Sequence, residues 1–327
     1  MRRLLTTLLV LIALTGAGLY LGYQWALERY REPGPLAQET RVVIRQGSGL
    51  EAISRELEAA GVIADADHFR IAARATEQAR RLKAGEYAFT PGISLKETLD
   101  LLESGKTVVR RLTVPEGLTS VEVVALLGEA EGLTGELAEV PPEGSLLPET
   151  YHYSWGESRQ GLLQRMQADF EKALEELWRQ RAEDLPIETP QEAVVLASIV
   201  EKETGVAEER PLVASVFVNR LRKGMPLQSD PTVSYALTEG RAPLGRELTR
   251  ADWLFESPYN TYRQKGLPPG PIANPGRSAL AAVLDPADSG FLYFVADGSG
   301  GHAFASSLAE HNRNVANWRR VKRDASR

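Results

Sequence analysis

The first hydrophobic feature of the chain is an uninterrupted apolar stretch near its N-terminus. Residues 4–27 contain no charged side chain. At about 1.5 Å per residue, a helix over residues 4–23 is long enough to cross the hydrocarbon core of a bilayer. Arg2 and Arg3 precede it, and the positive-inside rule predicts that this end stays in the cytoplasm. A cleaved signal peptide is the alternative, but the run is longer than a signal h-region and no A-x-A site follows it.

A second pattern begins after a short charged segment, residues 28–40, which is expected to be a linker. The same pattern occurs three times, in residues 42–53, 87–97 and 112–122. A short run rich in β-branched residues is followed by a glycine turn and then by apolar residues at helical spacing. Two of these helical patterns begin at capping-box spacing, Ser94 with Glu97 and Thr119 with Glu122. Small β–α packing units explain this pattern. A more specific interpretation is that residues 41–111 resemble a LysM-like glycan-binding module.

The second half of the chain is mainly helical. Residues 162–178 repeat apolar side chains at helical spacing among many Glu, Lys and Arg, which predicts an amphipathic surface helix. Near the C-terminus, two short apolar runs flank a glycine-rich connection in residues 291–304, and this predicts a β-hairpin. Between these elements, Thr189 and Glu192 form a capping box that predicts the start of a further helix, which is expected to end at Glu203.

Glu203 lies on the apolar side of this helix. At about 100° per residue, it falls in the middle of a continuous apolar arc formed by Val195, Leu196, Ile199 and Val200. Desolvation and the helix dipole would both raise the carboxyl pKa there, and a carboxyl that is protonated near neutral pH can act as a general acid. The alternative is that the helix frays and Glu203 meets solvent. Glu201, about 160° away around the helix, is expected to form an ion pair or to meet water.

Composition narrows the classes of function. The 327 residues are 43% hydrophobic, which excludes wholesale disorder, and the net charge of −6 gives no support for a nucleic-acid partner. The absence of cysteine excludes disulfides and thiol catalysis. The four histidines fall at no metal-site spacing, so neither a metal nor a cofactor is expected. Residues 100–107 end like a phosphate-binding loop, but Asp100 stands where that motif needs glycine, and Gly105 is expected to end a helix.

A series of ordered motifs occupies residues 147–151, 197–204, 216–221, 227–233, 257–262, 266–271, 292–298, 301–304 and 310–312. These motifs resemble those of the endolytic murein transglycosylases, the YceG-like family, and the anchor and the LysM-like module fit that family's layout. Together with the hydrophobic patterns, the resemblance predicts an α+β fold in four parts. These are a transmembrane helix with its cytoplasmic end (1–27), a linker (28–40), a LysM-like module (41–111) and a mainly helical, lysozyme-like catalytic domain with a β-hairpin (112–327).

The resemblance also implies roles for individual residues. Glu203-Thr204 matches the glutamate followed by Ser or Thr of the lysozyme-like lytic transglycosylases, which implies that Glu203 is catalytic. Leu227-Gln228 resembles their methionine–glutamine element, with leucine in place of the methionine, and Tyr259-Asn260 resembles their tyrosine–asparagine element. The expected substrate-binding residues are therefore Gln228, Tyr259 and Asn260.

The reaction that the resemblance implies is non-hydrolytic cleavage of the β-1,4 bond between N-acetylmuramic acid and N-acetylglucosamine in peptidoglycan. One carboxyl can suffice where a glycosidase normally needs two, because the C6 hydroxyl of the muramoyl ring supplies the nucleophile and closes a 1,6-anhydro ring. The implied partners are glycan strands, the bacterial cytoplasmic (inner) membrane, with the catalytic part on its periplasmic side, and peptidoglycan synthases, beside which nascent strands would be terminated. A muramidase that admits water and an inactive, membrane-tethered peptidoglycan-binding protein are the alternatives.

Overall fold

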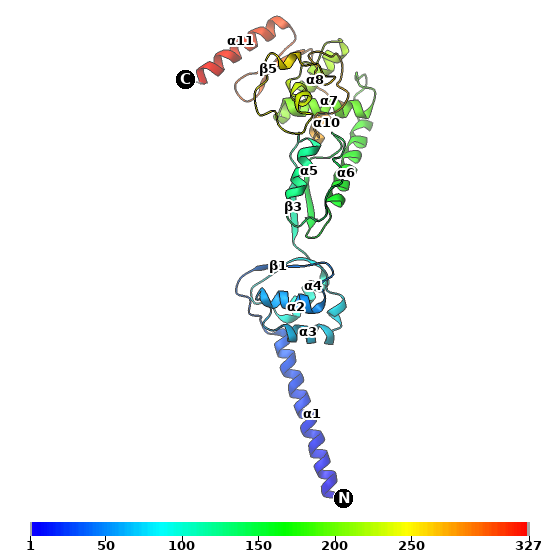
Figure 1. The fold of residues 1–327 in the computed structure, drawn as a ribbon, viewed down its shortest axis with the longest axis vertical. Coiled ribbons are helices and arrows are strands. Elements are labelled where there is room, and N and C mark those ends of the chain that lie inside the picture. Colours follow the sequence, from blue (N-terminus) through cyan, green and yellow to red (C-terminus); the bar gives the residue numbers. More distant parts are fainter. Residues whose placement is uncertain (1, 326–327) are drawn as a thin grey trace. The chain divides into compact units, whose positions relative to one another are not determined.

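The computed structural model describes residues 2–325, and these form two compact units (Figure 1). The first unit runs to Arg110 and includes the short segment His152–Glu157. The second unit contains Arg111–Tyr151 and the described residues from Ser158 onward. Helices dominate both units, and each also contains a two-stranded sheet. The mixture of helix and sheet predicted from the sequence is therefore confirmed.

The N-terminal apolar stretch forms one long helix, α1 (Arg2–Arg31). Within it, Leu9–Arg31 is long and apolar enough to cross a membrane by length and composition, as a signal sequence would also be. It is the one helix of this kind within residues 2–325. Large apolar side chains along it are exposed, among them Leu14 at 64% and Leu19 at 71%. In water such a surface is unfavourable, by about 25 cal/mol for each Å² of apolar area.

The first unit continues with β1 (Thr40–Ile44), α2 (Leu50–Ala59), α3 (Ala66–Ala75), the 3₁₀ turn η1 (Gln78–Arg80), β2 (Gly85–Phe89) and α4 (Leu95–Ser104). Strands β1 and β2 pair antiparallel, with Val42 opposite Tyr87. The helices contribute to a core in which Leu57, Phe69 and Leu99 are fully buried. The first two strand–turn–helix repeats predicted from the sequence are thus confirmed as β1–α2 and β2–α4.

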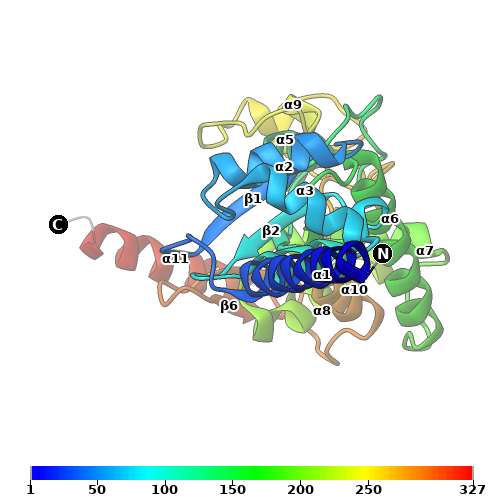
Figure 2. The ribbon, with the colours of Figure 1, turned by 90° about the horizontal axis from the view of Figure 1, so that it is seen from below.

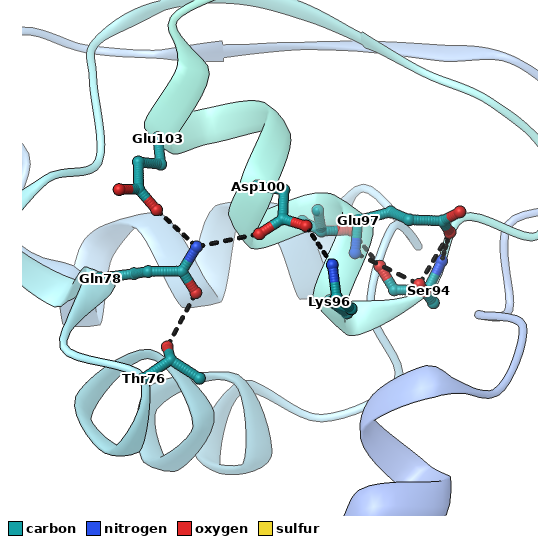
Figure 3. A network of polar contacts seen from close by, with 8 residues as sticks. Thr76, Gln78, Ser94, Lys96, Glu97, Asp100 and Glu103 are labelled. Atoms are coloured by element: carbon teal, nitrogen blue, oxygen red, sulfur yellow. Dashed lines mark hydrogen bonds and ion pairs between the residues drawn. The ribbon is translucent and has the colours of Figure 1, made fainter.

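Capping residues set the ends of α4. The Ser94 hydroxyl accepts a hydrogen bond from the Glu97 amide, and the Glu97 carboxylate accepts one from the Ser94 amide, which completes the predicted capping box (Figure 3). At the other end Gly105 adopts φ 72°, a left-handed conformation that strains any residue with a Cβ. The segment that ends like a phosphate-binding loop is therefore the C-terminal turn of a helix.

The boundary between the two units falls inside β3 (Val109–Thr113) and β4 (Thr150–Ser154), which pair with each other. Helix α5 (Ser120–Glu129) lies between these strands in the sequence. It continues with α6 (Arg159–Arg179), α7 (Pro190–Glu203), η2 (Ala207–Glu209), α8 (Arg210–Arg222), α9 (Asp230–Thr238), η3 (Asp252–Leu254), α10 (Arg277–Leu284), β5 (Tyr293–Ala296), β6 (His302–Ala305) and α11 (Leu308–Ala325). Strands β5 and β6 pair antiparallel. The third repeat, the long amphipathic helix and the hairpin are confirmed as β3–α5, α6 and β5–β6.

Helix α7 lies at the centre of the second unit. Every residue from Ala193 to Val200 is buried, and α7 packs against α6, α8, α9 and α10. The Asn274 amide, fully buried, fixes the segment before α10: it donates to the Leu118 carbonyl and accepts from the Leu146 amide, at 3.0 Å each. Because buried polar groups cost free energy unless they are paired, these bonds hold three distant segments in place around the helix.

Candidate active site

The last turn of α7 presents the candidate acid. The predicted capping box of Thr189 and Glu192 is present and starts the helix, and Pro190 occupies its first turn. Glu203 is the final helical residue, and Thr204 follows in an extended conformation. The Thr204 hydroxyl accepts a hydrogen bond from the Val206 amide at 3.0 Å. This hydrogen bond fixes the turn of the chain that follows the helix.

Glu203 is held by a serine from a different element. Its Oε1 accepts a hydrogen bond from the Ser229 hydroxyl at 2.5 Å. Ser229 is itself 1% exposed, and its amide donates to the Thr261 hydroxyl at 2.9 Å. Thr232 donates to the Ser229 carbonyl at 2.7 Å, so the serine is fixed on both sides. The Glu203 side chain is partly exposed, and it is neither frayed into solvent nor closed inside the core.

The surroundings of Glu203 raise its pKa to about 7. Desolvation by burial is the main cause, and the negative charge of Asp230 adds to it. The Ser229 hydrogen bond and the positive charge of Arg220 oppose the rise. The direction agrees with the position of Glu203 on the apolar arc of the helix. A carboxyl with this pKa is protonated in a substantial fraction of molecules at neutral pH and can donate a proton.

We expect Glu203→Gln to stabilise the fold at alkaline pH. The folded pKa of about 7 lies above the ordinary value of 4.5, so the stabilising contribution of the protonated group is complete below about pH 4.5 and is lost as pH rises through 7. The loss is on the order of 3 kcal/mol, and glutamine avoids it because it never ionises. Urea unfolding at a series of pH values should show a variant more stable than the wild type at about pH 8 and no such gain at about pH 4. Glu171→Gln, at an exposed site on α6, controls for the removal of one charge, and a gain that does not depend on pH would contradict this account.

The three predicted substrate-binding residues differ in accessibility. Gln228 is exposed and adopts φ 52°, an uncommon conformation for a residue other than glycine. Tyr259 is half-buried, its ring centroid lies 4.9 Å from that of Tyr235, and burial raises its pKa. A Cβ at Gly270 would lie 2.9 Å from the Tyr259 hydroxyl, so glycine leaves room for that group.

Asn260 is fully buried, and its amide is used within its own loop. The side-chain nitrogen donates to the carbonyls of Trp253 at 3.1 Å and Phe255 at 2.8 Å, and the oxygen accepts from the Tyr262 amide at 3.0 Å. This geometry supports a positioning role for Asn260. Its role as a substrate ligand, like the catalytic role of Glu203 and the binding roles of Gln228 and Tyr259, stays a prediction.

Arg220 of α8 joins the elements around the site. Its guanidinium donates to the carbonyls of Leu227 and Leu292, at 2.7 Å each, and lies 5.3 Å from the centroid of the Tyr293 ring. Burial lowers the pKa of Arg220. One cation thereby fastens the segment that carries Gln228 to the start of β5. Sequence reasoning assigned roles to neither Arg220 nor Ser229, although both lie inside motifs that carried the family resemblance.

Glu201 faces a second polar cluster, separate from Glu203. Its side chain is 4% exposed and accepts from Arg210 at 3.1 Å and from the Gly276 amide at 2.9 Å. Arg210 also donates to Glu116 at 2.9 Å, so one cation lies between two carboxylates. Desolvation raises the pKa of Glu201, and the charge of Arg210 opposes that rise. The sequence left two possibilities open for Glu201, an ion pair or contact with water, and the structure shows the ion pair.

The polar side chains of the site show no arrangement for a metal ion. In residues 2–325, no group of three acidic or histidine side chains converges closely enough to hold one. His302 is instead paired with Glu209, with 2.7 Å between Nδ1 and Oε2, and Asp230 accepts from the Tyr262 hydroxyl at 2.7 Å. The chemistry that this site offers is proton transfer by Glu203 beside hydroxyl and amide hydrogen-bonding groups.

Known proteins resemble this chain both in sequence and in structure. The chain is 32% identical to an endolytic murein transglycosylase of Streptococcus pneumoniae across 94% of its own length, and it spans 64% of that relative. It is 29% identical to an endolytic murein transglycosylase of Bacillus subtilis, with 83% of this chain and 82% of the relative covered. The crystal structure of a yceG-like protein from Listeria monocytogenes superposes with a TM-score of 0.53 at 31% identity, and the match covers 84% of this chain and 98% of that one. Because residues 42–317 match the YceG-like family, this chain belongs to that family.

Proposed function

We propose that the protein is an endolytic peptidoglycan transglycosylase in which Glu203 is the catalytic acid and base. The observation that carries the proposal is the Glu203 carboxyl, which ends a buried helix with a raised pKa and a serine hydroxyl on one oxygen. The names of the Streptococcus and Bacillus relatives support the same activity. The substrate would be the glycan strand, cleaved at the β-1,4 bond between N-acetylmuramic acid and N-acetylglucosamine.

Glu203 would act twice in one reaction cycle. Its proton passes to the glycosidic oxygen, and the bond from that oxygen to C1 of the muramoyl ring breaks. The resulting carboxylate then accepts the proton of the C6 hydroxyl, whose oxygen bonds to C1 and closes the 1,6-anhydro ring. No water is consumed, and the carboxyl ends protonated as it began. The Ser229 hydrogen bond would hold Glu203 in place, while Gln228 and Tyr259 would bind the sugars' acetamido groups and Asn260 would fix the loop that carries Tyr259.

Product analysis tests the reaction type. The purified full chain in detergent should release muropeptides from isolated sacculi whose muramoyl ends are lighter by one water molecule than those of a hydrolysis product. Mass spectrometry distinguishes the two products directly. Reducing muramoyl ends would instead identify a hydrolase that admits water. Binding to sacculi without release of any fragment would identify a binding protein and refute the enzymatic proposal.

We expect the chemical step to slow as pH rises above about 7. Glu203 must be protonated to act as the acid, and its pKa is about 7, so each further pH unit should lower the single-turnover rate by about tenfold. Below that value the rate should be insensitive to this group. Single-turnover cleavage of isolated glycan strands, followed across about pH 5–9, measures this fall in rate at alkaline pH. A rate that climbs through the same range would mean that Glu203 acts first as a base.

The arrangement of the chain at a membrane is part of the same proposal. The apolar part of α1 would be a single-pass anchor in the bacterial cytoplasmic membrane, followed by a linker, a LysM-like module (41–111) and the catalytic domain (112–327) on the periplasmic side. There it could terminate nascent strands beside peptidoglycan synthases. Protease added to spheroplasts should degrade the large domain, whereas full protection of that domain would refute this orientation.

A further inference from the structure

Helix α3 of the first unit has two apolar faces. Its inner face, Ala66, Phe69 and Ala73, is buried in the core. A second set of side chains at helical spacing, His68, Ile71 and Ala75, lies on the outer side, and Ala72 packs partly against the core between the two sets. Ile71 is 62% exposed. Within the described residues, Trp25 contacts His68 on this outer face, and Ile71 stays largely exposed.

This outer face forms one wall of a groove whose other wall is the C-terminal part of α1. Figures 1 and 2 show α3 beside that end of the helix. The groove has a volume of about 660 Å³, and most of the side chains that line it are apolar. They include Tyr23, Trp25, Tyr30, Ile63, Ile71 and Leu95. The Trp25 ring meets the His68 ring edge to face, with 6.2 Å between centroids, which closes part of one side.

The position of α3 is fixed by hydrogen bonds at its C-terminal end. The Gln78 amide donates to Asp100 at 3.1 Å and to Glu103 at 2.6 Å, and its oxygen accepts from the Thr76 hydroxyl at 2.8 Å (Figure 3). Thr76 caps α3, and both carboxylates belong to α4. Gln78 is itself buried. Helix α3 is thus held against α4 by these hydrogen bonds, so its outer face keeps a fixed position in the unit.

The groove lies where a bilayer surface would be. Its α1 residues, from Tyr23 to Tyr30, overlap the end of the apolar span Leu9–Arg31, so the inference rests on the proposed anchoring of α1. Tyr and Trp side chains favour the interface between hydrocarbon and headgroups. Residues 65–83, which contain α3, carry five basic and three acidic side chains in a chain of net charge −6, and this local excess suits an anionic membrane surface.

We propose that this groove binds the acyl chain of a phospholipid from the membrane that α1 spans. The lipid chain would cover the outer face of α3, and the module would rest on the outer surface of the bilayer. An acyl chain fits the apolar walls of the groove, and basic residues such as Arg29, which lies over the Trp25 ring at 5.5 Å, would face the headgroup.

The absence of cysteine in the chain makes a direct test possible. The full chain is prepared with one cysteine at a time, as Ile71→Cys in the groove, Leu19→Cys in α1 and Ala52→Cys on an exposed part of α2. Each is labelled with an environment-sensitive fluorophore and reconstituted into vesicles of phosphatidylethanolamine and phosphatidylglycerol. A phospholipid spin-labelled on its acyl chain, or in parallel one spin-labelled on its headgroup, is then included as quencher.

We expect the label at position 71 to lose most of its emission to the acyl-chain quencher and less to the headgroup quencher, while the label at position 52 is unaffected. Stronger quenching from the headgroup, or quenching no greater than at position 52, would overturn the inference. The label at position 19 separates the two proposals. If it is quenched and position 71 is not, the anchor stands and the lipid groove fails. If position 19 is not quenched, the anchor fails and the lipid groove fails with it.

Discussion

Glu203→Gln is expected to fold normally and to lose nearly all turnover. Glutamine keeps the shape of the side chain and can still accept the Ser229 hydrogen bond, but it cannot give a proton to the glycosidic oxygen or take one from the C6 hydroxyl. General acid–base catalysis is typically worth about 10²–10⁴-fold, and here one group serves in both steps. Release of anhydro-muropeptides from sacculi measures the loss, and circular dichroism confirms that the variant is folded.

Glu201→Gln is the matched control for this variant. It removes the same charge two residues away, in a cluster where the carboxylate faces Arg210 and the Gly276 amide, whereas Glu203 is bonded to Ser229. Arg210 and the Gly276 amide bond to different oxygens of Glu201, so glutamine can keep one of these two hydrogen bonds, and Arg210 keeps its pair with Glu116. We expect substantial activity to remain. An active Glu203→Gln beside a folded but inactive Glu201→Gln would reverse the assignment of the catalytic residue.

Arg210→Met is expected to produce the largest loss of stability in the second unit. Arg210 is 11% exposed at its side chain and lies between the Glu201 and Glu116 carboxylates, and methionine would leave those like charges facing each other. Removal of one partner from a buried ion pair typically costs about 3–5 kcal/mol. Urea unfolding measures the change, and Arg222→Met, which removes a guanidinium bonded to an exposed part of the chain, should cost far less.

A second substitution shows whether like-charge repulsion causes this loss. Arg210→Met combined with Glu201→Gln leaves a single carboxylate in the cluster, and it should recover part of the stability that Arg210→Met loses. The coupling between the two positions is read from a double-mutant cycle. If the two effects simply add, packing of the Arg210 side chain determines its contribution, and the electrostatic account of the cluster is wrong.

Local patterns predicted most of the secondary structure because the signals are themselves local. The capping boxes of α4, α5 and α7 need only residues three apart, and each forms as expected. Glu203 was predicted on the apolar side of its helix from angular spacing alone, and its raised pKa follows from that position. Glu201 showed the limit of the method. Angular spacing left an ion pair and solvent open, because Arg210 belongs to another helix.

Contacts between distant elements could not be predicted in this way. Ser229 lies 26 residues from the carboxyl that it holds, and nothing in the spacing of either residue indicates the hydrogen bond. The family resemblance implied that Asn260 binds substrate, and nothing in the sequence indicated that its side-chain amide is bonded to carbonyls of its own loop. The outer face of α3 was also not anticipated, because its helical pattern already accounts for one buried face.

Arg220 has a consequence for how the second unit opens. Its guanidinium bonds at once to the carbonyl of Leu227, just before the segment of Gln228 and Ser229, and to that of Leu292, at the entry to β5. When either segment moves away, a buried charged donor loses an acceptor, and that loss opposes the movement of both. The loop and the hairpin should therefore behave as one cooperative unit in local unfolding, and thermal fluctuation should seldom release Glu203 from Ser229 while the hairpin stays closed.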